Sequence, residues 1–264
     1  MRLKILRRAT QIATLIFIIL IPVLNKKGIT FLIGSLYSFA IGPVWITDPL
    51  SGFQVIISSL TVEKTLLLSM AIPIVSAMFF GRVFCGWMCP QNTISEIFDS
   101  LAVRIMPKRL PEPSPRPKIR YMIMGLLLIS APLLGFPVAN LISAPGIISV
   151  QAANYIYAGS VGIELGLIGL IVLSEIFLVR RLWCNYVCPQ GAFLGLFRIG
   201  KTMKVAYIED EEHVCSQCFE CAKSCQLGLD PMVGKIYPLC HNCGDCIAAC
   251  ERMKAGGKPL SFKF

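Results

Sequence analysis

Charged residues are scarce in this sequence of 264 residues. Asp, Glu, Lys and Arg together make up 15% of the chain, whereas hydrophobic residues make up 55% and the mean hydropathy is +0.68. Ordinary soluble domains contain about 45–50% apolar residues. The shortage of charge and the excess of apolar residues argue against a soluble domain and predict an integral membrane protein.

Acidic residues are fewer than basic ones, and the imbalance is confined to one part of the chain. Residues 1–200 contain 17 Lys and Arg against 7 Asp and Glu, whereas residues 201–264 contain 8 of each, so the net charge of +10 belongs to the first part. The basic residues cluster at the ends of apolar segments, as the positive-inside rule describes. This pattern indicates orientation in a membrane and argues against nucleic acid as a partner.

A cleavable export signal is also lacking. The first apolar stretch, residues 9–24, has no small-residue cleavage site behind it and is followed by Asn25, Lys26 and Lys27. We therefore expect this stretch to be retained as a membrane helix. Without an export signal, closely spaced cysteines indicate metal ligation rather than a disulfide framework.

Four segments have the apolar character of membrane spans, each near the length of about 20 residues that a spanning helix needs. They are residues 9–24, 65–81, 121–142 and 161–179. The basic N-terminus, the basic middle loop and Arg180 with Arg181 would then share the cytoplasmic side. Both termini are therefore expected in the cytoplasm.

Residues 31–46 are also apolar enough to span. A fifth span would place the N-terminus and the basic middle loop on opposite faces, against the charge rule. Gly34, Gly42 and Pro43 also disfavour a continuous helix. We expect an outer-surface or re-entrant segment here.

Two stretches of the chain resemble each other. Residues 82–91 and 181–190 both contain an Arg, an aromatic residue before a first Cys, another aromatic residue, and then Cys-Pro-Gln. This similarity predicts two parallel helix-pair repeats, related by an axis along the membrane normal. The symmetry would bring together four thiols at the cytoplasmic boundary, namely Cys85, Cys89, Cys184 and Cys188.

The chemistry of these four cysteines stays open at this point. Arg82 and Arg181 lie three residues before the leading cysteine of each motif and would favour thiolates. The four thiols could hold a third metal ion or iron–sulfur cluster, act as a dithiol redox pair, or pack the helix ends without reacting.

The other eight of the twelve cysteines form two consecutive Cys-x2-Cys-x2-Cys-x3-Cys runs near the C-terminus. This is the bacterial two-cluster ferredoxin pattern, in which the last Cys of each run ligates the other cluster. It predicts two [4Fe–4S] clusters. One set is Cys215, Cys218, Cys221 and Cys250, and the other is Cys240, Cys243, Cys246 and Cys225.

Zinc also accepts four thiolates, but two interleaved runs with this spacing make zinc a poor alternative. One departure is that Gln226 and Glu251 follow the fourth cysteines, where ferredoxins usually have Pro. Histidine is scarce, and because cysteine supplies all eight ligands, neither His213 nor His241 is needed for iron.

These features together resemble the NapH family of membrane-bound ferredoxin-type proteins, whose relatives include MauN-type proteins and the membrane portions of NosR-type and CcoG-type proteins. The resemblance extends over essentially the whole chain and rests on the paired Cys-x3-Cys-Pro motifs, at Cys85–Pro90 and Cys184–Pro189, and on the two-cluster tail. It implies a multi-pass protein of a prokaryotic cytoplasmic membrane. The expected fold is mainly α, with four transmembrane helices in two repeats and a C-terminal α+β ferredoxin domain.

The expected domains are a first helix-pair repeat (1–104), a Pro-rich cytoplasmic linker (105–119), a second repeat (120–205) and a cytoplasmic ferredoxin-like domain (206–264).

The resemblance implies a subunit of a quinol dehydrogenase complex. Such a protein takes electrons from the membrane quinone pool and passes them through iron–sulfur clusters to a redox partner, either a ferredoxin-like iron–sulfur protein or a multihaem cytochrome. The alternative, suggested by the CcoG-type relatives, is a redox or metal-handling assembly factor for a metalloenzyme.

Ionisable groups inside spans are functional candidates by default. Glu164 and Glu175 in the fourth predicted span are therefore candidates for quinone binding or proton transfer, and Asp48 on an outer segment could also line a quinol head-group pocket. Two structural interpretations compete with this one: Glu175 could pair with Arg180 or Arg181, and Glu164 could lie in the outer headgroup layer.

Overall fold

The computed structural model describes residues 2–105, 117–207, 218–232, 236–253 and 260–264. The helical body includes α1 (Arg2–Lys26), α3 (Lys64–Phe80), α6 (Pro117–Leu134) and α9 (Glu164–Phe177). Each overlaps one predicted span. Within the described part of the chain, one helix is by itself long and apolar enough to cross a membrane, α1 over Leu3–Lys26, and α3 is a shorter apolar helix.

The prediction of one continuous segment over residues 121–142 was wrong. Helix α6 ends at Leu134, and a separate short helix α7 (Ala139–Ile142) follows. Gly135 has a φ of +74°, which is left-handed backbone, and Pro137 cannot donate to a helix ladder. Helix α6 also begins at Pro117, inside the predicted linker, whereas residues 106–116 of that linker lie outside the described residues.

As predicted, residues 31–46 do not form a continuous helix. They belong to a three-stranded antiparallel sheet that the sequence did not predict, in the order β1 (Leu32–Ser35), β2 (Ser38–Ile41), β3 (Val44–Thr47). Gly34 has a φ of +116°, and a Cβ there would collide with the backbone of Ser38. This position therefore requires glycine.

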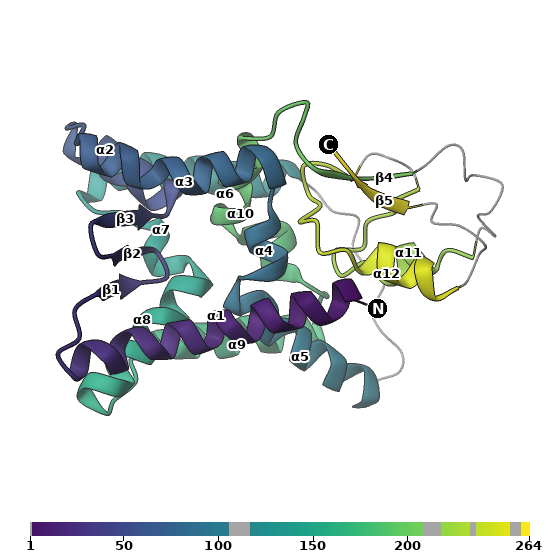
Figure 1. Cartoon of the computed structure of the whole chain (residues 1–264), viewed down its shortest axis with the longest axis horizontal. Coiled ribbons are helices and arrows are strands. Elements are labelled where there is room, and N and C mark those ends of the chain that lie inside the picture. Colours follow the sequence, from purple (N-terminus) through teal and green to yellow (C-terminus); the bar gives the residue numbers. More distant parts are fainter. Residues whose placement is uncertain (1, 106–116, 208–217, 233–235, 254–259) are drawn as a thin grey trace.

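Two further helices, α2 (Pro49–Ser59) and α8 (Ala144–Ala158), were not predicted. They lie with the sheet at the end of the molecule opposite the C-terminal module (Figure 1). Helix α2 contacts α6 and α3, and α8 contacts α1 and α9. Pro49 and Pro145 occupy the first turns of these helices, where the missing N–H costs nothing.

The two cysteine-bearing stretches follow the same order of elements. After α3 come α4 (Val83–Trp87) and α5 (Pro90–Ile105); after α9 come η1 (Trp183–Val187) and α10 (Pro189–Leu196). In each stretch the proline of Cys-Pro starts the last helix. The second motif differs in forming a π-helical turn, a geometry often found at functional sites.

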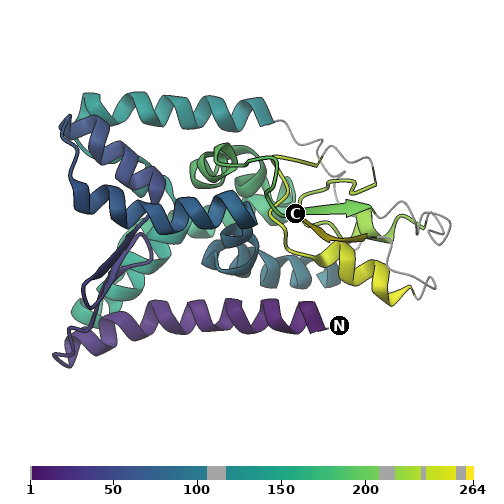
Figure 2. The same ribbon diagram turned by 45° about the horizontal axis from the view of Figure 1, so that its top comes forward.

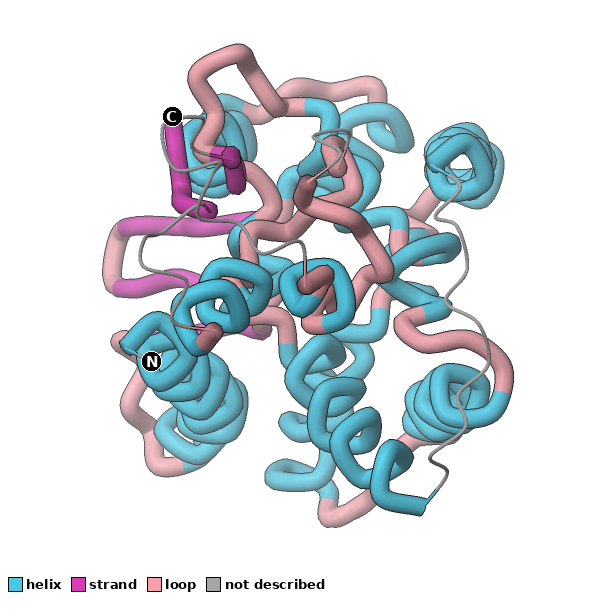
Figure 3. The backbone as a smooth tube through the Cα atoms, turned by 90° about the vertical axis from the view of Figure 1, so that its right-hand side faces the viewer, coloured by secondary structure: helices cyan, strands magenta, loops and turns pink. Residues whose placement is uncertain are grey.

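The C-terminal module has α+β structure. Strands β4 (Lys204–Tyr207) and β5 (Leu260–Lys263) pair antiparallel, and the helices are α11 (Glu220–Lys223) and α12 (Asp245–Arg252). Its core includes Val205, Leu227, Leu229, Ile236 and Leu260. The module covers one end of the helical body (Figure 2), and from that end several helices are seen along their axes (Figure 3).

Candidate iron–sulfur site and its contacts with the helical body

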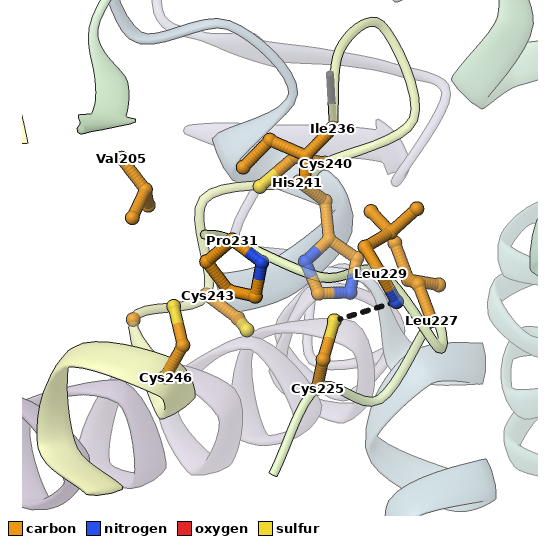
Figure 4. A pocket seen from close by; sticks show the side chains of 11 residues that line it. Val205, Cys225, Leu227, Leu229, Pro231, Ile236, Cys240, His241, Cys243 and Cys246 are labelled. Atoms are coloured by element: carbon orange, nitrogen blue, oxygen red, sulfur yellow. Dashed lines mark hydrogen bonds between the residues drawn. The ribbon is translucent and has the colours of Figure 1, made fainter. Parts of the chain in front are cut away.

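Four cysteines of the C-terminal module line one cavity (Figure 4). They are Cys225, Cys240, Cys243 and Cys246, and the apolar walls include Val205, Leu227, Leu229 and Ile236. These are the four residues predicted as one ligand set, including Cys225, which belongs to the other run. The fold thus brings the predicted set to one place, as a crossed-over cluster requires.

The surroundings of these sulfurs suit a metal-bound thiolate. Burial raises the pKa of the Cys240, Cys243 and Cys246 thiols, because a lone thiolate loses its hydration there. Positive iron would compensate that loss. The backbone N–H of Leu229 donates to Cys225 Sγ at 3.4 Å, the kind of bond that tunes iron–sulfur potentials. The donor set and the cavity therefore fit a cluster.

The other predicted ligand set is only partly described. Cys215 lies outside the described residues, whereas Cys221 and Cys250 pack in the module's core and Cys218 is half-buried. Among the described residues, no three His, Cys, Asp or Glu side chains are arranged to hold a single metal ion. The first ligand set remains a prediction.

The Cys-x3-Cys-Pro cysteines lie between the helical body and this module. Cys188 interacts electrostatically with Cys85, and Cys184 with Cys188 and Cys89. Cys184 also packs against the core of the C-terminal module. The structure thus places all four near one another, and Cys184 against the module as well.

The first motif contacts the loop that holds the second cysteine run. Arg82 Nη1 donates to the carbonyl oxygens of Pro238, at 3.1 Å, and Leu239, at 2.9 Å. Trp87 Nε1 donates to the carbonyl of Asn242 at 3.0 Å. A Cβ on Gly86 would lie 2.9 Å from the carbonyl oxygen of His241, so only glycine permits this approach.

The second motif contacts the end of the first cysteine run. Arg181 Nη2 donates to Gln226 Oε1 at 3.1 Å, and Gln226 Nε2 donates to Asp245 Oδ2 at 2.6 Å. Arg7 of α1 binds the same Asp245 oxygen at 2.8 Å and Glu96 at 2.5 Å. Gln226 stands where ferredoxins usually have Pro, and its amide explains that departure: it joins the module to the helical body.

Asn242 joins three segments and was missed by the sequence analysis. Its Nδ2 donates to the carbonyls of Phe80, at 3.0 Å, and Met203, at 2.8 Å, and its Oδ1 accepts from Tyr237 Oη at 2.8 Å. Its φ of +53° is left-handed backbone, which Asn tolerates better than most residues. An Asn between two cysteines of a run gives no sequence signal for such contacts.

We expect Asn242→Ala to lower the free energy of unfolding by about 3 kcal/mol, because several buried partners would lose their hydrogen bonds. Asn140→Ala is the matched control, since the side chain of Asn140 pairs with Ser51 Oγ, and it should cost about 1 kcal/mol. Thermal unfolding in detergent measures both. Equal losses would contradict the role of Asn242 as a docking residue.

The three candidate carboxylates differ in their burial and hydrogen bonds. Asp48 is buried and caps α2, accepting from the Ser51 N–H and Oγ, each at 2.9 Å, and from Gln190 Nε2. Glu164 is exposed and accepts from Gln151 Nε2 at 2.9 Å. These bonds give both residues structural roles.

Glu175 differs, because one of its oxygens is buried without a hydrogen-bond partner. Its Oε1 accepts from the Trp183 N–H at 3.3 Å, but Oε2 has none. Arg180 instead binds Asp99, and Arg181 binds Asn92 and Gln226.

Glu175 lines a small cavity between α5 and α9, formed by Ser95, Phe98, Asp99, Val172, Glu175, Ile176 and Arg181.

Comparison with known proteins adds independent information. A family model described as a 4Fe-4S binding domain matches residues 64–109 and 161–204, which are the two stretches with the Cys-x3-Cys-Pro motifs. No solved structure shows a significant match.

Several curated relatives match most of this chain. The ferredoxin-type protein NapH of Escherichia coli (strain K12) is 25% identical over 78% of this chain and 72% of its own. The methylamine utilization ferredoxin-type protein MauN of Methylorubrum extorquens is 28% identical over 83% and 73%, and NapH of Haemophilus influenzae is 26% identical over 66% and 61%. The chain is a homologue of the NapH and MauN ferredoxin-type proteins, and a 4Fe-4S binding domain model matches its two Cys-x3-Cys-Pro stretches.

Proposed function

We propose that this chain is a membrane subunit that oxidises quinol and relays the electrons to a partner redox protein of a respiratory complex. The observation that carries the proposal is the four-cysteine cavity, docked directly on the Cys-x3-Cys-Pro motifs of the helical body. Cys225, Cys240, Cys243 and Cys246 would hold one [4Fe–4S] cluster. Cys215, Cys218, Cys221 and Cys250 would hold another. Such clusters supply one-electron transfer, which divides a two-electron oxidation into two steps.

The outer faces of the helices support a multi-pass membrane location. Leu126 and Leu133 of α6 are 67% and 80% exposed, and α1, α3 and α9 also expose large apolar side chains. A lipid environment would cover these faces. We assign α1, α3, α6 and α9 as four spans of a prokaryotic cytoplasmic membrane, with both termini and the C-terminal module in the cytoplasm. One family model matches two stretches of the chain, residues 64–109 and 161–204, which supports the two repeats.

The same match supports a third redox centre. The 4Fe-4S model covers Cys85, Cys89, Cys184 and Cys188, which are electrostatic neighbours at the contact between body and module. We assign these thiols to a further cluster or metal, close to the four-cysteine cavity.

Glu175 is the best candidate for the group that takes a proton from quinol, and the cavity beside it has room for about one water. Its Oε2 is buried without a hydrogen-bond partner and would accept the proton of a quinol hydroxyl directly or through such a water. Oxidation of quinol to quinone releases two electrons and two protons, and Glu175 would be the first acceptor of a proton. Glu175 is also an electrostatic neighbour of Cys184.

The test is reduction of the clusters by quinol. Anaerobically purified protein, with menaquinol or ubiquinol analogues and its redox partner, should develop the EPR signal of reduced [4Fe–4S] clusters within seconds to minutes of mixing. The partner would be a ferredoxin-like iron–sulfur protein or a multihaem cytochrome. Clusters that dithionite reduces but neither quinol does would refute quinol oxidation while leaving electron relay intact.

A further inference from the structure

His241 is a buried side chain without any hydrogen bond. It is 3% exposed, and both ring nitrogens are buried with no partner in the described structure. Leaving a buried polar group unpaired costs about 1–3 kcal/mol. Nearly all buried polar groups in folded proteins have a hydrogen-bond partner. An imidazole without one therefore indicates that a bound group supplies the partner.

The position of the ring indicates which ligand this is. His241 lines the same cavity as the four cysteines, and Figure 4 shows its ring within that group of side chains. On its other side lies Gly86, between the cysteines of the first Cys-x3-Cys-Pro motif. A Cβ on Gly86 would be 3.1 Å from His241 Nδ1, so this is the nitrogen toward the helical body. Nε2 is then the nitrogen available to the cavity.

Neutral imidazole offers one N–H donor and one acceptor nitrogen. Hydrogen bonds to cluster sulfurs are one of the factors that set reduction potentials, since they stabilise the more negative, reduced state. The Leu229 N–H already makes such a bond to Cys225. His241 can supply a second donor, its Nε2–H, from the wall of the cavity that adjoins the Cys-x3-Cys-Pro motif.

We propose that His241 is a positioning residue for electron transfer, donating its Nε2–H to a sulfur of the cluster in the four-cysteine cavity and thereby raising that cluster's reduction potential. The ring fills the space between this cavity and Gly86. His241 therefore adjusts the reduction potential of the cluster beside the helical body, where electrons would enter the module. This inference rests on the cluster proposed above and concerns its potential, not its presence.

Three substitutions test it in full-length protein. Gln places an amide N–H close to the position of Nε2, Asn places one close to Nδ1, and Phe keeps a ring without a donor. EPR-monitored redox titration should show reduction made about tenfold less favourable in His241→Phe and His241→Asn, which is about 59 mV for one electron. His241→Gln should stay near the wild-type potential.

Iron analysis separates the possible failures. Wild-type protein without iron would overturn the cluster and this inference together. Iron-loaded variants that all share the wild-type potential would overturn the role of His241 alone and leave the proposed function standing. If His241→Phe does not fold, the two amide variants decide: the inference needs Gln to exceed Asn in potential, and equal potentials would refute it.

Discussion

Replacing Cys225 with serine is expected to remove about four irons per chain, the content of one [4Fe–4S] cluster. Cys225 shares a cavity with Cys240, Cys243 and Cys246, although it belongs to the other run. Its sulfur also accepts the Leu229 N–H. Serine keeps the size of the side chain but is a poor ligand for iron. The remaining three thiols would not retain an intact cubane.

Iron and sulfide quantification with EPR measures the loss. Wild-type protein should contain about eight irons with two clusters, or about twelve with a third. Ser224→Ala is the control, because Ser224 adjoins Cys225 but its hydroxyl bonds to the Cys221 carbonyl. It should keep full iron. A Cys225→Ser protein with wild-type iron would show that the crossed-over ligand set is wrong.

Much of the site could be predicted because cysteine spacing has few chemical meanings. The crossover rule assigns Cys225 to the second run from the sequence alone, and the cavity contains that set. The contacts that dock the module could not be predicted in this way. Arg7, Gln226 and Asp245 are far apart in sequence, and no local pattern pairs a guanidinium with one carboxylate rather than another.

The helical body was predicted less completely. Long apolar runs identified α1, α3, α6 and α9, since length and composition alone suffice for them. Helix α2 has 11 residues, and α8 interrupts its apolar residues with Gln151 and Asn154; short apolar runs do not distinguish a helix from a strand or loop. Residues 32–47 form strands because a tight turn at Leu36 and Tyr37 and a second at Gly42 and Pro43 fold the run back on itself, an outcome set by pairing between segments.

Glu175→Gln is expected to slow quinol-driven cluster reduction by at least about 100-fold, the usual contribution of a positioned proton acceptor. Gln has nearly the same shape and keeps the carbonyl that accepts the Trp183 N–H. It cannot take a proton at the position of Oε2, which is the unpaired atom of the cavity. Reduction by dithionite needs no quinol and should be unchanged.

Glu164→Gln is the matched control, because it makes the same substitution on the same helix. Glu164 is exposed and bonds to Gln151, so its amide form should reduce at close to the wild-type rate. Rapid mixing followed by EPR compares the three proteins, and binding of menadione reports whether each protein binds a quinone. Equal rates for both variants would place the quinol site elsewhere. Slow reduction with unchanged menadione binding would locate the defect in proton transfer, because the quinone would still bind to the protein.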